Sequence, residues 1–226
     1  MIIVFDLDDT LYNEIDFVNN GFNVVANYLK KKFGVNKQKS LIFLKKKFLI
    51  NRKKKIINLL LSNLNIKVTK KELTLIINLY KYNNKKIRIH KTQLDCLKKL
   101  SSNKNIYLVT DGNPKVQQSK IKKLKIKKYF KNVYYTSLFG NKAHKPSLKV
   151  FSYIIKKEKK NFKDLIYIAD NPFKDFKNLN KVNATTIRIL SGYFRSKKLN
   201  QKVSKFKVKN FKNLIKLINK IKKDYK

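Results

Sequence analysis

Short apolar runs, separated by helical patterns, are the feature that most constrains the fold of this chain. Five runs rich in Ile, Val, Leu and Tyr are each stopped by polar or turn residues: 2–5, 106–110, 133–136, 165–169 and 185–190. Continuous apolar runs of this length are typical of strands buried on both faces of a parallel sheet. Helical patterns lie between or beside the later runs, at 90–102, 115–128, 147–159 and 173–181. This alternation predicts an α/β fold with a doubly wound parallel sheet.

A long stretch after the first apolar run interrupts this alternation. Residues 14–88 contain no convincing strand and are too long for a simple crossover connection. Helical patterns occur there near 15–33, 38–50, 52–64 and 70–82. We therefore expect two domains: a core of 1–13 and 89–226, and a small α-helical domain of 14–88 inserted after the first strand.

The C-terminal segment 211–223 places its apolar residues on one helical face. A basic amphipathic helix of this kind either packs on a sheet or touches a membrane surface. We favour packing on the sheet.

The charge of the chain is strongly basic, with 56 Lys and Arg against 13 Asp and Glu, a formal net charge of +43. Such a charge suggests nucleic-acid binding, since cationic side chains neutralise phosphates. Base readout and tight phosphate contacts favour Arg, however, and the only arginines are Arg52, Arg88, Arg188 and Arg195. The lysines are spread along the whole chain. We interpret the charge as a composition bias on a solvated surface and expect no specific nucleic-acid partner, although non-specific polyanion binding is expected.

Other features of the sequence limit where the protein works. No apolar run approaches the roughly 18–20 residues of a membrane span, and Asp6 interrupts the N-terminal apolar stretch that a signal peptide would need. A single cysteine, Cys96, excludes an internal disulfide. We expect a cytoplasmic protein without a membrane partner. Repulsion between copies at +43 favours a monomer or a weak homo-oligomer.

The few acidic residues cluster at the ends of predicted strands. Six of the 13 acidic residues lie in three short segments, 6–13, 110–114 and 170–175, where chance placement predicts about one. They are Asp6, Asp8, Asp9, Asp111, Asp170 and Asp175. The carboxyl ends of parallel strands meet where the strand order reverses, so we expect these carboxylates to converge. Converging carboxylates repel one another unless a cation lies between them, and an all-oxygen ligand set indicates Mg²⁺.

Four motifs occur in one order along the chain. They are IIVFDLDDTLY at 2–12, Thr110 in YLVTDGN, Lys145 in HKPSLKVF, and Asp170 with Asp175 in IADNPFKD. In these motifs the sequence resembles the haloacid dehalogenase (HAD) superfamily, specifically its aspartate-dependent phosphatases, over about residues 2–192. The resemblance implies a Rossmann-like core, with the insert 14–88 as a type-1 helical cap.

The resemblance also implies roles for these residues. Asp6 becomes the nucleophile that forms an aspartyl-phosphate, and Asp8 the general acid and base. Thr110 and Lys145 hold the phosphoryl oxygens. Mg²⁺ is bound by Asp6, the Asp8 backbone carbonyl and Asp170. Asp175 is an auxiliary acid that orients Lys145 or a metal-bound water.

Two positions depart from the family pattern. Ala169 stands before Asp170 where Gly is usual, and Asp111 follows Thr110 where Asn is common. We include Asp111 and Gly112 among the substrate-binding candidates. Because a further negative charge beside a phosphate is unfavourable, we expect the Asp111 side chain to point away and cap the turn with Gly112 and Asn113.

Several polar residues outside the motifs are weaker candidates. Asn13, Glu14, Asp16, Asn19, Asn20 and Arg52 lie where a cap contacts substrate, but we favour ordinary linker and surface roles for each. His90 and His144 are too isolated for a metal pair, although His144 neighbours Lys145. Cys96 is expected in the core.

The sequence thus predicts a Mg²⁺-dependent phosphatase acting on a small phosphorylated metabolite, a sugar phosphate or nucleotide. A phosphomutase of the same superfamily remains an alternative, since Asp8 can return the phosphoryl group to a sugar. A phosphoacceptor receiver module also combines acids, Thr and Lys, but its acceptor Asp follows the third strand. A lysine-rich nucleic-acid-binding protein on an inactive HAD fold is the alternative from a different class.

Overall fold

The computed structural model describes residues 1–50, 52, 55–102 and 105–224. These residues form two compact units, one of residues 1–14 and 87–226 and the other of residues 15–86. The inserted unit begins one residue later and ends two residues earlier than the expected insert 14–88.

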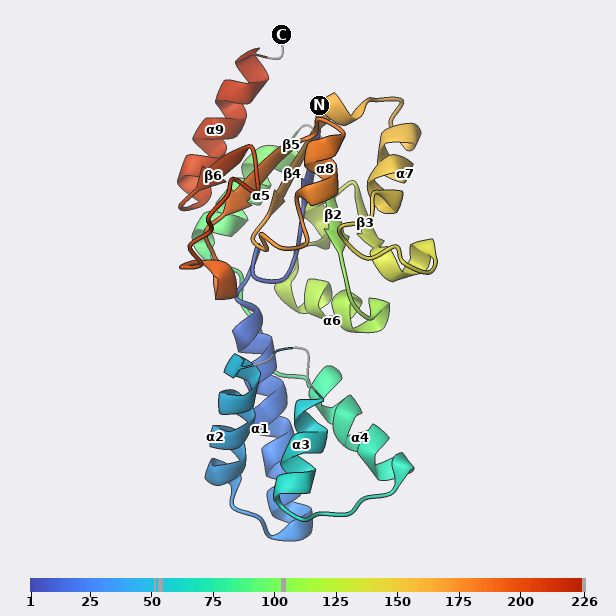
Figure 1. The fold of residues 1–226 in the computed structure, drawn as a ribbon, viewed down its shortest axis with the longest axis vertical. Helices are drawn as coiled ribbons and strands as arrows, with labels where there is room; N and C mark the ends of the chain where they lie inside the picture. Colours follow the sequence, from blue (N-terminus) through green and yellow to red (C-terminus); the bar gives the residue numbers. More distant parts are fainter. Residues whose placement is uncertain (51, 53–54, 103–104, 225–226) are drawn as a thin grey trace. The chain divides into compact units, whose positions relative to one another are not determined.

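A six-stranded parallel sheet forms the centre of the larger unit, in the order β3-β2-β1-β4-β5-β6 (Figure 1). The strands are β1 (Ile2–Phe5), β2 (Ile106–Thr110), β3 (Asn132–Tyr135), β4 (Leu165–Ala169), β5 (Thr185–Ile189) and β6 (Phe206–Val208). The prediction of a doubly wound parallel sheet is confirmed. β6 was not predicted, because only Val208 of its three residues is buried and the strand therefore lacks an apolar run.

The strand order reverses at β1. The chain runs outward from β1 to β2 and β3, and then returns to β4 on the other side of β1. Phe5, the last residue of β1, pairs with Leu108 of β2 and with Ile168 of β4. Asp6 therefore follows β1 at the switch point of the sheet, where ligands bind in folds of this type.

Helices cover both faces of the sheet. On one face, α7 (Lys149–Lys157) and α8 (Lys177–Lys181) enclose a core that includes Tyr107 and Tyr167. Figure 1 shows α5 (Lys91–Ser101) and α9 (Phe211–Asp224) together on the other side. Phe211, Leu214 and Ile218 of α9 are buried, so the C-terminal helix packs in the core as predicted.

Several predicted helices are shorter than expected, and the pattern at 147–159, for example, becomes α7 at Lys149–Lys157. The pattern at 115–128 becomes α6 (Pro114–Leu124), which ends where Lys125 adopts a φ of 55°. The pattern at 173–181 becomes a helix only from Lys177. Short 3-10 turns complete the unit at Lys127–Tyr129, Thr136–Phe139, Phe162–Asp164 and Gly192–Phe194.

All the secondary structure described in the smaller unit is helical. The helices are α1 (Glu14–Phe33), α2 (Lys37–Ile50), α3 (Ile56–Asn63) and α4 (Lys70–Lys81). Their apolar faces share one core, in which Phe22, Leu44, Leu60 and Ile76 are buried. The predicted helix 52–64 begins at Ile56 in the structure, and residues 53 and 54 of that prediction lie outside the described residues.

No helix within the described ranges is both long enough and apolar enough to cross a membrane.

Candidate functional site

The loop that follows β1 is held tightly at the switch point. The backbone N–H of Asp6 donates to the carbonyl of Ile168 at 2.9 Å, which extends the β1–β4 pairing. Asp9 accepts hydrogen bonds from the backbone N–H groups of Glu14 and Tyr193, at 2.9 and 3.2 Å. A Cβ on Gly192 would lie 2.2 Å from the Asp9 side chain, so only glycine allows this close approach.

Three buried carboxylates converge at the carboxyl ends of β1 and β4. One oxygen from each of Asp6, Asp170 and Asp175 lies within 4.8 Å of the others. The Thr10 hydroxyl lies 3.5 Å from an Asp6 oxygen and 3.4 Å from an Asp170 oxygen. The donors are all oxygen atoms, which is the ligand chemistry that Mg²⁺ prefers. The residues present therefore fit a divalent cation.

Lys145 inserts its ammonium group among these carboxylates. Its Nζ lies 2.5 Å from Asp6 Oδ1 and 3.0 Å from Asp175 Oδ1, and its side chain is fully buried. The Tyr167 hydroxyl is 3.0 Å from the same Nζ and donates to Asp175 at 3.1 Å. The backbone N–H of Asn171 donates to the other Asp175 oxygen. Asp175 thus orients the lysine and also contributes to the carboxylate cluster.

Burial and like charges determine the titration of this cluster. Burial raises the pKa of Asp6 to about 6, although the Lys145 ammonium acts to lower it. Burial and the carboxylates of Asp6 and Asp175 raise the pKa of Asp170 well above its usual value. Burial opposes the charge on Lys145, but Asp175 and Asp6 raise its pKa well above the usual value. One ammonium group does not balance three carboxylates, so the cluster favours an additional cation.

Asp8 lies in a different set of contacts, formed by α6. Lys120 Nζ lies 2.7 Å from Asp8 Oδ1, and Gln117 Nε2 donates to Asp8 Oδ2 at 2.8 Å. The Tyr12 hydroxyl donates to Asp8 Oδ1 at 2.5 Å. Although burial acts to raise the pKa of Asp8, the Lys120 charge and these hydrogen bonds lower it below the usual value.

Gln117 also connects Asp8 to Thr110. Its Nε2 lies 2.6 Å from Thr110 Oγ1 and 2.8 Å from Asp8 Oδ2, so one amide bridges the loop after β1 and the end of β2. Gln117 and Lys120 were not among the residues predicted from the sequence. Their spacing of three residues on a helix that starts four residues after Thr110, at Pro114, was the available signal, but Lys120 looks like any other lysine in this chain.

The expectation for Asp111 was wrong. Its carboxylate accepts hydrogen bonds from the Thr136 hydroxyl at 2.7 Å and from the Lys145 backbone N–H at 3.2 Å. Lys174 Nζ, which the sequence analysis also missed, lies 3.2 Å from its other oxygen. Burial acts to raise the pKa of Asp111, but Lys145 and Lys174 lower it overall. The turn is capped instead by Asn113, whose side chain accepts from the Val116 N–H at 3.3 Å.

The structure places the remaining candidates as follows. Gly112 has a φ of 104° in the turn after Thr110. His144 joins the Asp111 contacts, with Nδ1 3.2 Å from the Thr136 hydroxyl. Asn13 contacts His90 at 3.3 Å within the larger unit. Cys96 is buried in α5 as expected, and burial raises the pKa of its thiol to about 12.

Candidates in the smaller unit have contacts within that unit. The Asn20 side chain donates to the Lys86 carbonyl at 2.9 Å. Arg52 stacks on Phe48, with 4.8 Å between the guanidinium carbon and the ring centroid. Asp16 and Asn19 lie in α1. Nothing in these contacts assigns any of them a role in binding a ligand.

The fold and the carboxylate cluster together define an α/β protein of the doubly wound class, with a cluster of buried carboxylates at its switch point. Residues 3–189 match the haloacid dehalogenase-like hydrolase family. The chain belongs to this family.

Known relatives agree with this assignment. The chain is 27% identical over 245 residues to a glyceraldehyde 3-phosphate phosphatase of Methanocaldococcus jannaschii, with 98% of each chain covered. A HAD phosphatase from Thermococcus onnurineus has a similar fold, with a TM-score of 0.63, 18% identity, and coverage of 96% of this chain and 97% of that one. A putative HAD-hydrolase from Bacillus subtilis, solved with bound magnesium, gives a TM-score of 0.69 at 15% identity, with coverage of 96% and 98%.

Proposed function

We propose that this protein is a Mg²⁺-dependent phosphatase that hydrolyses a small phosphorylated metabolite through an aspartyl-phosphate on Asp6. The observation that carries the proposal is the buried group of Asp6, Lys145, Asp170 and Asp175 at the switch point of the sheet. It offers a carboxylate nucleophile, a fixed cation for the phosphoryl oxygens, and a set of oxygen ligands. A retired enzyme fold that only binds nucleic acid has no need for this buried charged group.

Asp6, Asp170 and the Asp8 backbone carbonyl hold the metal in this proposal. Asp175 belongs to the same set, because its carboxylate lies within the cluster. When bound, Mg²⁺ supplies positive charge to the phosphoryl group and offsets the repulsion between the carboxylates.

The protein's own residues then account for two steps. Lys120 and its hydrogen bonds keep Asp8 ionised in the free protein, so Asp8 takes up a proton from solvent when substrate binds. An Asp6 oxygen forms a bond to phosphorus while the bond from phosphorus to the leaving-group oxygen breaks, and Asp8 gives that oxygen its proton. Water next attacks phosphorus, Asp8 takes its proton, and the bond to Asp6 breaks to release phosphate. Lys145 and Thr110 hold the phosphoryl oxygens throughout.

The smaller unit, residues 15–86, acts as a type-1 cap that helps to select the substrate. The curated relative is named for glyceraldehyde 3-phosphate, so that triose phosphate is the first compound to test, beside sugar phosphates and nucleotides. Asp111, with Lys174 and His144 around it, is part of the substrate-binding side of the site.

Metal removal gives a direct test of the proposed ligand set. With EDTA, hydrolysis of an aryl phosphate or of glyceraldehyde 3-phosphate falls by about 100-fold or more, and Mg²⁺ restores it. Mg²⁺ also raises the melting temperature of the wild type by relieving repulsion in the cluster. This thermal shift disappears in Asp170→Asn and persists in Asp95→Asn, a variant of an exposed acid on α5. Full activity in EDTA contradicts the proposal.

Lys120 is a positioning residue for Asp8. Lys120→Met removes the ammonium group that fixes the Asp8 carboxylate, so kcat falls by about 10- to 100-fold while KM changes little. Lys120→Arg restores part of kcat. The matched control is Lys122→Met, at an exposed position of the same helix. Equal kcat for the Lys120→Met and Lys122→Met variants would contradict this role.

A further inference from the structure

A cavity outside the candidate active site lies in the larger unit, at the β5–β6 edge of the sheet. Its volume is about 750 Å³, and it is lined by the end of β5, the segment after it and β6, over residues 188–207. None of the described residues that line it belongs to the candidate active site. Its size is typical of sites that bind small organic molecules.

The lining of this cavity is strongly cationic. Arg188, Arg195 and five lysines between positions 197 and 207 line it, and no acidic residue is among the described lining residues. The sequence itself contains no Asp or Glu between Asp175 and Asp224. A cavity walled by one sign of charge concentrates ions of the opposite sign.

The arginines distinguish this cavity from the basic surface elsewhere. The chain has only four arginines among its 56 basic residues, and two of them are here, where chance placement gives fewer than one. The guanidinium group offers planar, paired donors that match phosphate oxygens, which the ammonium group of lysine lacks. A second hollow of about 980 Å³, beside β3, is lined by five lysines and no arginine among its described residues.

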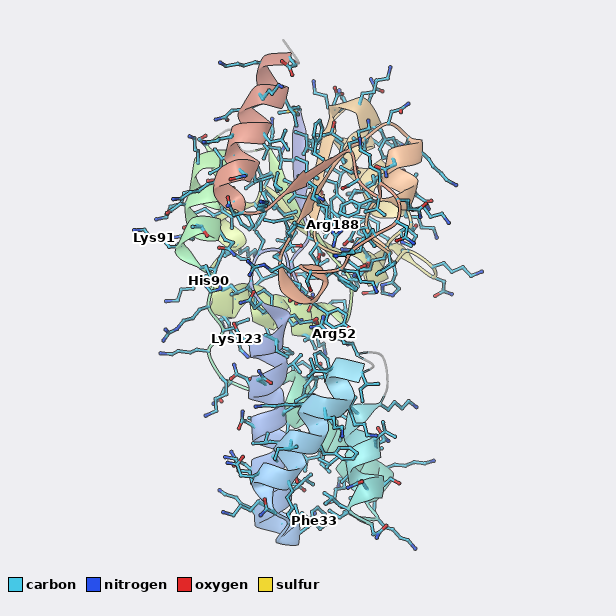
Figure 2. The ribbon with its side chains drawn as sticks, turned by 60° about the vertical axis from the view of Figure 1, so that its left-hand side comes forward. Phe33, Arg52, His90, Lys91, Lys123 and Arg188 are labelled. Atoms are coloured by element: carbon cyan, nitrogen blue, oxygen red, sulfur yellow. The ribbon has the colours of Figure 1, made fainter. Side chains whose placement is uncertain are left out.

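Arg188 is the most informative of these side chains (Figure 2). It is only 4% exposed, and its Nη2 donates to the Phe194 carbonyl at 2.7 Å. Its Nε is buried and has no hydrogen-bond partner among the described residues. A buried donor without an acceptor is unfavourable, and an anion bound beside Arg188, which lines the cavity, would supply that acceptor.

We infer that this cavity binds a small molecule carrying at least two phosphate groups, at a site separate from the proposed catalytic centre. Arg195 provides a guanidinium fork for phosphate oxygens, and Arg188 provides its unpaired Nε donor. Leu190, Leu199 and Phe206 provide apolar wall for an organic part of the ligand. The shared chemistry is a diphosphate, whether inorganic or attached to a nucleoside.

Calorimetric titration of the metal-free protein tests this inference. Pyrophosphate and ADP are titrated in EDTA and about 150 mM NaCl, where diffuse surface attraction is screened and the carboxylates of the catalytic centre repel anions. We expect the double variant Arg195→Gln/Lys197→Gln to weaken binding by about tenfold or more. Arg188→Lys, which keeps the charge but removes the unpaired Nε donor, also weakens binding.

The matched control removes the same charge from the other basic hollow. Lys122→Gln/Lys125→Gln changes the affinity by less than about twofold, because those lysines lie outside the cavity. Tighter binding of ADP than of pyrophosphate identifies an organic ligand, and equal binding identifies the diphosphate alone as the recognised group. Equal weakening by both double variants, or no measurable binding to the wild type, overturns the inference. None of these results depends on phosphatase activity.

Discussion

Asp6→Asn is expected to lower phosphatase activity by on the order of 10⁴-fold or more. The amide has nearly the shape of the carboxylate, but it does not supply the anionic oxygen that attacks phosphorus. The same substitution removes the negative charge that lies 2.5 Å from Lys145 Nζ in the wild type. Steady-state hydrolysis of an aryl phosphate with Mg²⁺ measures the change.

Asp95→Asn serves as the matched control for this variant. It makes the same chemical change at an exposed site on α5 and leaves activity near the wild-type level. Because burial and the Asp175 carboxylate destabilise charge at position 6, Asp6→Asn is expected to remain folded. Activity within tenfold of wild type in a folded Asp6→Asn protein contradicts the assignment of the nucleophile.

Lys145→Met gives the second largest effect, on both activity and stability. Loss of a cation that faces the phosphoryl oxygens lowers kcat/KM by about 10²- to 10³-fold. The same change leaves Asp6 and Asp175 without their shared ammonium partner, and breaking a buried ion pair costs about 3–5 kcal/mol of unfolding free energy. Denaturant unfolding in EDTA measures the loss of stability.

Added Mg²⁺ recovers part of that stability in Lys145→Met but not its activity, because the ion neutralises the carboxylates without replacing the lysine. Lys156→Met, at an exposed position of α7, is the control and changes neither quantity appreciably. If Lys145→Met is as stable in EDTA as Lys156→Met, the ammonium group does not hold this cluster together.

Strands buried on both faces were predictable from the sequence, because each is a continuous apolar run. β1, β2 and β4 have the predicted bounds. β6 was not predictable, since two of its three residues are exposed and its pairing with β5 depends on backbone hydrogen bonds. The late start of α8 at Lys177 follows from the turn after β4, in which the Asn171 N–H bonds to Asp175.

The site was predictable only where rare residue types mark it. Acidic residues are scarce in this chain, so Asp6, Asp170 and Asp175 were conspicuous, and the structure brings them together. Lys120 and Lys174 were not conspicuous among so many lysines. Only tertiary packing distinguishes the buried Lys120 beside Asp8 from its exposed neighbour Lys122 on the same helix.

The covalent intermediate is the most direct test of the central claim. We would quench the wild-type protein with acid during turnover of a phosphorylated substrate with Mg²⁺, and locate the bound phosphoryl group by peptide mass spectrometry. The account predicts a phosphoryl group on Asp6, within the peptide that contains residues 2–12, and its absence from the Asp6→Asn variant. Rapid hydrolysis without a phosphorylated protein, or a phosphoryl group on a different residue, would contradict it.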